Sequence, residues 1–181
     1  MFKILGIMLV ILIAFTAPLA AQEKPAAEPT PAAKPTDVSS PNAILTALYD
    51  VISGPAGPRD WNRFRSLFAP GARLIPTGPR PDGTAGARVL SPEDYIARTT
   101  PVFEKDGFYE KEIARRTERF GNILHAFSTY EGRHAAEDAQ PFIRGINSIQ
   151  LYFDGSRWWI LTVFWQPETP ESPLPKDYLP K

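Results

Sequence analysis

The stretch FIRGINSIQLYFDGSRWWILTVFW, residues 142–165, decides the fold that the sequence predicts. Two apolar-rich runs flank the dipeptide Asp154-Gly155. This pair favours a tight turn, because glycine tolerates a positive φ and aspartate can bond its own backbone. The stretch therefore predicts a β-hairpin. Side chains alternate along its first arm, and one face carries Ile143, Gly145, Asn147, Ile149, Leu151 and Phe153.

The second arm of this hairpin is apolar on both faces. Strict alternation gives one face Trp158, Ile160, Thr162 and Phe164, and the other Trp159, Leu161, Val163 and Trp165. A strand that is apolar on both faces must be covered on both. We expect the chain's own helices to cover one face and a second subunit to cover the other. The hairpin thus predicts a homodimer through the outer face of the sheet.

Composition limits the classes of function. The 181 residues suffice for one domain, and 20 basic residues balance 20 acidic ones, so a nucleic-acid partner is not expected. There is no cysteine, and the two histidines, His125 and His134, are too few for a histidine-based metal cluster. The sequence also carries no glycine-rich phosphate loop and no nucleophile elbow. We therefore expect no cofactor and no metal.

Residues 1–21 have the pattern of a secretory signal peptide, with Lys3 before an apolar run and small residues before Gln22. The alternative is an uncleaved membrane anchor, but a spanning helix needs roughly 18 to 20 apolar residues and this run is shorter. Either way we expect a periplasmic or secreted protein with no other membrane segment. Residues 22–40 are rich in proline and alanine, which predicts a disordered linker.

Residues 41–166 form the predicted folded domain. Capping residues and apolar periodicity predict helices that begin at Pro41, after Asp60 and at Pro92. A short strand is expected at residues 72–76 and a loop at 78–86. Long strands are expected at 108–119 and 123–133, followed by the hairpin. Charged side chains share one face of the first long strand, which predicts a solvated face: Glu110, Glu112, Arg116 and Glu118. Residues 167–181 should form an extended proline-rich tail.

This order of elements predicts an α+β fold with helices on one side of a sheet. Three motifs, DWNRFRSLFAPGARL (60–74), SPEDYIARTTPVF (91–103) and LYFDGSRWWILTVFW (151–165), resemble the NTF2-like superfamily, in particular its SnoaL-like bacterial branch. The resemblance covers residues 41–166. It implies a cystatin-like cone, in which three N-terminal helices pack on a curved, mostly antiparallel sheet around an internal pocket, and often a dimer. It does not fix a function, because this fold hosts many activities.

The candidate site residues are polar side chains on apolar faces. His125 lies between Ile123 and Phe127, and we expect it to line the pocket, close to a central residue of the hairpin's first arm such as Asn147 or Ser148. A neutral histidine there could act as a general base near pH 7. Asn147 or Tyr49 could hold a substrate oxygen. The alternatives are a structural histidine in the core or at an interface, and an asparagine that bonds a neighbouring strand. The expected pocket residues are Tyr49, Trp61, Tyr95, Asn147 and Trp165.

Three functions remain open. The domain could bind a small apolar ligand or a partner protein in or around the cone pocket. It could instead be a cofactor-free lyase, isomerase or hydrolase that uses His125 as the base. It could also be a dimerisation module whose pocket is filled by its own aromatic side chains. The ketosteroid-isomerase mechanism is disfavoured, because no aspartate lies on an apolar face in the middle of a long strand.

Overall fold

The structure is a computed structural model that describes residues 30–80 and 82–181. The predicted signal segment and residues 22–29 lie outside the described residues. Six strands form one sheet: β1 (Phe68–Pro79), β2 (Ala85–Ala87), β3 (Tyr109–Phe120), β4 (Ile123–Arg133), β5 (Ile143–Phe153) and β6 (Trp158–Pro167). Their order is β2-β1-β6-β5-β4-β3, and β1 and β6 are the parallel pair among antiparallel neighbours.

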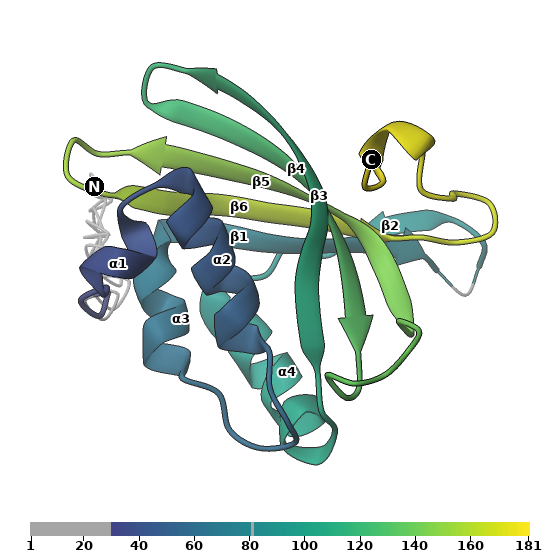
Figure 1. The fold of residues 1–181 in the computed structure, drawn as a ribbon. Coiled ribbons are helices and arrows are strands. Elements are labelled where there is room, and N and C mark those ends of the chain that lie inside the picture. The colour runs from purple at the N-terminus through teal and green to yellow at the C-terminus, as the bar shows by residue number, and fades with distance from the viewer. Residues whose placement is uncertain (1–29, 81) are drawn as a thin grey trace, which may run out of the picture.

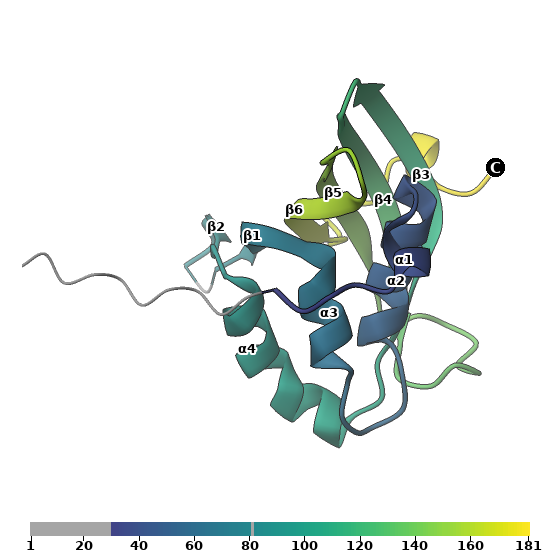
Figure 2. The same cartoon turned by 90° about the vertical axis from the view of Figure 1, so that its left-hand side faces the viewer.

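Three helices cover one face of this sheet, and the sheet curves around them (Figures 1 and 2). They are α2 (Pro41–Ile52), α3 (Trp61–Leu67) and α4 (Pro92–Lys105). Each begins at a side-chain cap, from Ser40, Asp60 or Ser91, and Ser91 forms a full capping box with Asp94. The predicted α+β architecture is therefore confirmed. The core lies between these helices and the inner face of the sheet.

A fourth helix precedes these three and corrects the predicted linker. α1 (Pro35–Val38) is a single turn that packs on the domain, and Val38 is 5% exposed within the core. Arg63 of α3 donates a 2.7 Å hydrogen bond to the Asp37 carboxylate. The folded part thus begins before Pro41. Composition misled here, because one buried valine and one ion pair are too few to produce apolar periodicity.

The hairpin forms as predicted, but its second arm is not a regular strand. Gly155 has a φ of 101°, and the Asp154 carboxylate accepts backbone hydrogen bonds across the turn. A β-bulge at Leu161 then shifts the register of β6 against β5. As a result, side chains from both sides of the bulge face the core: Trp158, Ile160, Val163 and Trp165. Strict alternation was wrong for β6, and the bulge accounts for much of its two-sided apolar character.

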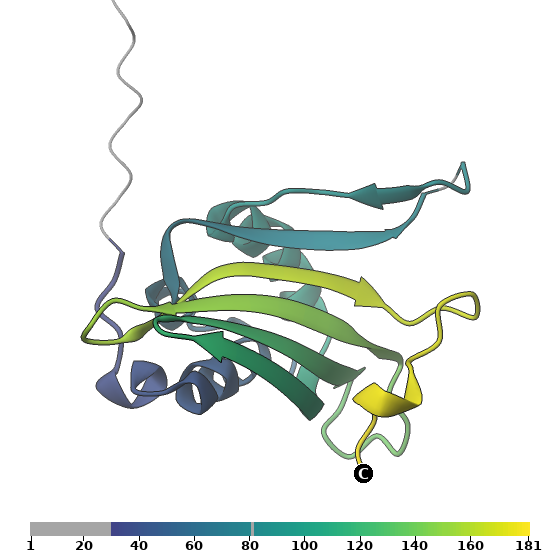
Figure 3. The ribbon, with the colours of Figure 1, turned by 90° about the horizontal axis from the view of Figure 1, so that it is seen from above.

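The C-terminal segment lies over the outer face of the sheet, on the side away from the helices (Figure 3). It contains the short 3-10 helix η1 (Lys176–Tyr178). The Tyr178 ring lies 5.0 Å from that of Phe127 on β4, and the Thr129 hydroxyl donates a 2.7 Å bond to the Tyr178 carbonyl. The tail is therefore pinned to the sheet. Within the described ranges, no helix has both the length and the apolar composition for crossing a bilayer.

Candidate functional site

A cavity of about 230 Å³ lies inside the cone, between the helices and the inner face of the sheet. Aromatic rings form much of its wall: Phe64, Tyr95, Phe103, Phe108, Tyr130 and Trp165. Several of these rings pack on one another, as Phe64 does on Tyr95 at 5.3 Å and Phe103 on Phe108 at 5.0 Å. The wall is thus largely apolar and held in place by ring packing.

Four of the five expected pocket residues line this cavity: Tyr49, Tyr95, Asn147 and Trp165. Trp61 does not line it. The indole of Trp61 lies behind the wall, stacked on Phe103 at 6.1 Å and edge-on to Phe64 at 5.6 Å. That the four lining residues bind a ligand stays a prediction.

Asn147 and Tyr49 belong to a chain of polar side chains at one end of the cavity. The Asn147 amide nitrogen donates to the Tyr49 hydroxyl at 3.0 Å and to the Glu110 carboxylate at 3.3 Å. The Tyr49 hydroxyl and the Ser128 hydroxyl lie 2.7 Å apart, and the Ser128 hydroxyl donates to the Glu112 carboxylate. Two carboxylates therefore terminate this network, and only Glu110 lines the cavity.

Glu110 is the site residue that sequence analysis missed. Its strand was predicted to carry four charged residues on one solvated face, and that prediction is wrong. A β-bulge at Ile113 shifts the register of β3 against β4. Before the bulge, Glu110 and Glu112 lie on the inner face, and after it Arg116 lies beside Phe127 on the outer face. The sequence did contain one signal for a buried carboxylate, because this charged strand directly precedes an apolar strand and consecutive strands usually pair.

Ser53, directly after α2, fixes the position of Glu110. The Glu110 backbone N–H donates to the Ser53 hydroxyl at 2.9 Å, and this hydroxyl lies 2.7 Å from the Tyr49 carbonyl oxygen. Gly54 and Phe108 also exchange backbone hydrogen bonds at 2.8 and 3.0 Å. The end of α2 and the start of β3 are therefore joined, which brings a helical tyrosine and a strand carboxylate to the same end of the cavity.

The electrostatics of the cavity centre on this carboxylate. Burial in the apolar cavity raises the pKa of Glu110 to about 7, against a smaller lowering by the Asn147 hydrogen bond. Burial, and then the charge of Glu110, raise the pKa values of Tyr49, Tyr95 and Tyr130, so the three phenols stay protonated. No group of three or more His, Cys, Asp or Glu in the described part of the chain is arranged to hold a metal ion.

His125 does not line the cavity, and the expectation that it would is wrong. Its β4 neighbours Leu124 and Ala126 face the core, so His125 lies on the outer face. There its Nε2 lies 2.9 Å from the Ser148 hydroxyl, and its ring is edge-on to Phe127 at 5.8 Å. The expected proximity to a central residue of β5 is confirmed, but on the other side of the sheet from Asn147.

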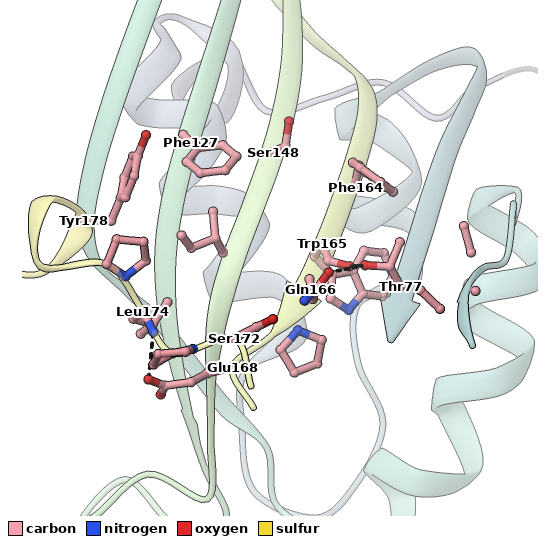
Figure 4. A pocket seen from close by; sticks show the side chains of 17 residues that line it. Thr77, Phe127, Ser148, Phe164, Trp165, Gln166, Glu168, Ser172, Leu174 and Tyr178 are labelled. Carbon is pink, nitrogen blue, oxygen red and sulfur yellow. Dashed lines mark hydrogen bonds between the residues drawn. The ribbon is translucent and has the colours of Figure 1, made fainter. Parts of the chain in front are cut away.

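A second concavity, of about 610 Å³, lies on this outer face between the strands and the C-terminal segment (Figure 4). Phe127, Ser148 and Phe164 line it from the sheet, and Tyr178 lines it from the tail. The tail is anchored at its start, where the Glu168 carboxylate accepts a 2.9 Å bond from the Leu174 N–H. This groove has a largely apolar floor, and the Glu168 carboxylate that lines it is paired with Arg144 at 2.8 Å.

Comparison with known proteins identifies the fold. No protein-family model and no curated protein matches the sequence. Among solved structures, a Nostoc punctiforme protein of unknown function with a cystatin-like fold is similar over 70% of this chain and 87% of its own, at 8% identity and a TM-score of 0.53. A Caulobacter vibrioides protein with a cystatin-like fold is similar over 72% and 88%, at 11% identity and a TM-score of 0.50.

A third structure, from Thiobacillus denitrificans, is provisionally described as a calcium/calmodulin-dependent protein kinase type II association domain. It is similar over 78% of this chain and all of its own, at 14% identity and a TM-score of 0.55. Likenesses at such identities show the fold alone. The chain has the cystatin-like fold that the sequence predicted, while membership of the NTF2-like superfamily and of its SnoaL-like branch stays a prediction.

Proposed function

We propose that this NTF2-like domain binds a small, largely apolar molecule inside the cone, with a polar end of that molecule at Glu110 and Asn147. One observation carries the proposal: a single cavity combines a mostly aromatic wall with converging polar groups. This combination is typical of small-molecule sites. Ligand pockets usually have volumes of roughly 300 to 1,000 Å³. A cavity of about 230 Å³ therefore favours a compact ligand.

A cofactor-free lyase, isomerase or hydrolase is the second candidate function, with Glu110 rather than His125 as the general base. The specific observation is a carboxylate that lines the apolar cavity, where burial raises the pKa of Glu110 to about 7. A carboxyl group that titrates near neutral pH can both take and return a proton. The protonated Tyr95 and Tyr130 hydroxyls could then stabilise a developing oxyanion. This function would place the protein nearer to the SnoaL-like branch.

We also propose export to the periplasm or the medium, and a homodimer through the outer sheet face. The first rests on the signal-peptide pattern of residues 1–21. The second rests on large apolar side chains that remain exposed on that face: Ile123 is 60% exposed, Phe164 43% and Leu161 38%. A partner protein bound at this face is the competing proposal.

The binding function is tested by mass spectrometry of small molecules released from the purified, heat-denatured protein. Asn147→Leu removes one of the two polar groups at this end of the cavity, and Ser148→Ala is its matched control, because the adjacent residue lies on the opposite face. We expect a compound that copurifies with wild type and the control but is lost from Asn147→Leu. Circular dichroism checks that each variant is folded. The proposal fails if wild type releases no compound and no small molecule from a fragment library raises its melting temperature.

A further inference from the structure

Two side-chain oxygens at the cavity have acceptor capacity to spare. Glu110 Oε1 accepts one hydrogen bond, from the Asn147 amide, while Glu110 Oε2 and Asn147 Oδ1 accept none from residues 30–80 and 82–181. In the same ranges, no fully buried side-chain nitrogen or oxygen lacks a partner, so both of these oxygens are open to the cavity that their residues line. A ligand that donates hydrogen bonds would satisfy both.

The Glu110 carboxylate also has no cationic partner in the described part of the chain. No salt bridge involves it, and burial and the Asn147 hydrogen bond account for its altered pKa. Arg59 lies behind the cavity wall, 5.1 Å from the centre of the Phe103 ring, and its guanidinium donates to four backbone carbonyls. Arg115 pairs with Glu112 at 2.7 Å. Both arginines are thus engaged elsewhere.

The remaining groups at the cavity carry no charge that could replace a cation. From α2, α4 and β4, the groups that face Glu110 are the phenols Tyr49, Tyr95 and Tyr130, which stay protonated. The rest of the wall is mostly apolar, with the rings of Phe64, Phe103, Phe108 and Trp165 among aliphatic side chains. Such rings attract cations through their negative faces, most strongly where water is excluded. An unpaired carboxylate and an aromatic wall therefore favour the same kind of ligand.

We infer that the cavity binds a small organic amine in its ammonium form, whose N–H groups donate to Glu110 and Asn147 while its apolar part packs against the aromatic rings. This inference rests on the proposed function and names the class of ligand. A bound ammonium would favour the ionised form of Glu110 and so lower the pKa of this carboxyl below about 7. An uncharged ligand that displaces water would instead raise the pKa of Glu110 further.

The test compares shape-matched pairs of ligands with the purified protein at pH 8, by isothermal titration. The pairs are benzylamine and benzyl alcohol, cyclohexylmethylamine and cyclohexylmethanol, and hexylamine and hexanol. We expect at least one amine to bind about tenfold more tightly than its alcohol, the ratio expected of one charge-assisted hydrogen bond. Glu110→Gln should remove most of this preference. Glu118→Gln, on the same strand but exposed on the outer face, should retain it.

The pH dependence gives a second readout. At pH 5.5 Glu110 is protonated in the free protein, so the preference for the amine should shrink, while the affinity for the alcohol should change little. Carbon-13 NMR of the Glu110 carboxyl should show a lower pKa in the amine complex.

The outcomes separate the inference from the function on which it rests. Alcohols that bind wild type as tightly as amines overturn the amine inference and leave a small-molecule site. The inference is also overturned if the preference for the amine survives Glu110→Gln. It is likewise overturned if Glu118→Gln abolishes the preference, because the overall charge of the protein would then account for it. If no member of either series binds at millimolar concentration, the amine inference is overturned, and the proposed function fails with it only if the wild type also releases no compound and no fragment raises its melting temperature.

Discussion

Replacing Glu110 by glutamine should change how the stability of the protein depends on pH. The substitution keeps the size of the side chain and an oxygen that can accept the Asn147 hydrogen bond, but it removes the titrating group. The pKa of this carboxyl is raised from 4.5 to about 7 in the folded protein. Between these two pH values the folded protein keeps a proton that the unfolded chain has lost. The free energy of unfolding therefore decreases as the pH rises through this window.

The magnitude follows from the size of this increase. One pKa unit corresponds to about 1.36 kcal/mol, so the ionised carboxylate costs the folded state about 3 kcal/mol at pH 8. Partial exposure of Glu110 makes this an upper value. The difference in stability between Glu110→Gln and wild type should thus be constant below pH 4.5. It should then shift in favour of the variant by up to about 3 kcal/mol on reaching pH 8.

Urea unfolding followed by tryptophan fluorescence, at intervals from pH 4 to 9, measures this difference. Taking the difference between two proteins cancels the contributions of the other carboxyl groups. Glu118→Gln is the control, since its side chain is exposed on the outer face of the same strand, and its curve should run parallel to that of wild type. The reasoning is refuted if the Glu110→Gln curve is also parallel to that of wild type across this range.

Three further predictions concern the fold and its assembly. Trp158→Ala should lower the free energy of unfolding by about 3 to 5 kcal/mol, because this indole is 4% exposed in the core. Trp159→Ala, on the outer face, should lower it by much less. Equal losses in urea unfolding would contradict the placement of Trp158 inside and Trp159 outside. Gly145→Ala should lower the free energy of unfolding by about 1 to 3 kcal/mol, since the added methyl group would lie 2.4 Å from a backbone oxygen. Gly78→Ala should lower it by almost nothing, since no atom lies within 4 Å of the added methyl group. Thermal unfolding distinguishes the two variants. Phe164→Lys should convert a dimer into a monomer in light scattering, and a wild-type protein that is already monomeric would rule out the proposed dimer.

Local chemistry made much of the architecture predictable. The helix starts follow from Ser40, Asp60 and Ser91, whose side chains cap the first turn of whichever helix they precede. The hairpin follows from Asp154-Gly155, because these residues form the turn from interactions within a few residues. The alternation of β4 and β5 was also correct, since the side-chain period of two is a property of the strand itself.

Which face of a strand points into the cone was not predictable for β4. Ile123 and Phe127 on one face are as apolar as Leu124 and Ala126 on the other, so hydrophobicity could not select the buried side. For this reason His125 was expected inside the cone, whereas it lies outside, beside Ser148. The choice depends on where the helices pack, which involves residues far away in the chain.

The candidate site shows the same division. The sequence alone determined that Tyr49, Tyr95, Asn147 and Trp165 are polar or amphipathic residues within apolar elements, which is a local property. Only the tertiary structure decided that Glu110 joins them. The charge pattern of β3 is that of a solvent-exposed strand. The bulge at Ile113, which puts Glu110 on the inner face and Glu118 on the outer face, arises from the pairing of β3 with β4. Register shifts and enclosure depend on which segments meet across the fold, and no single segment encodes them.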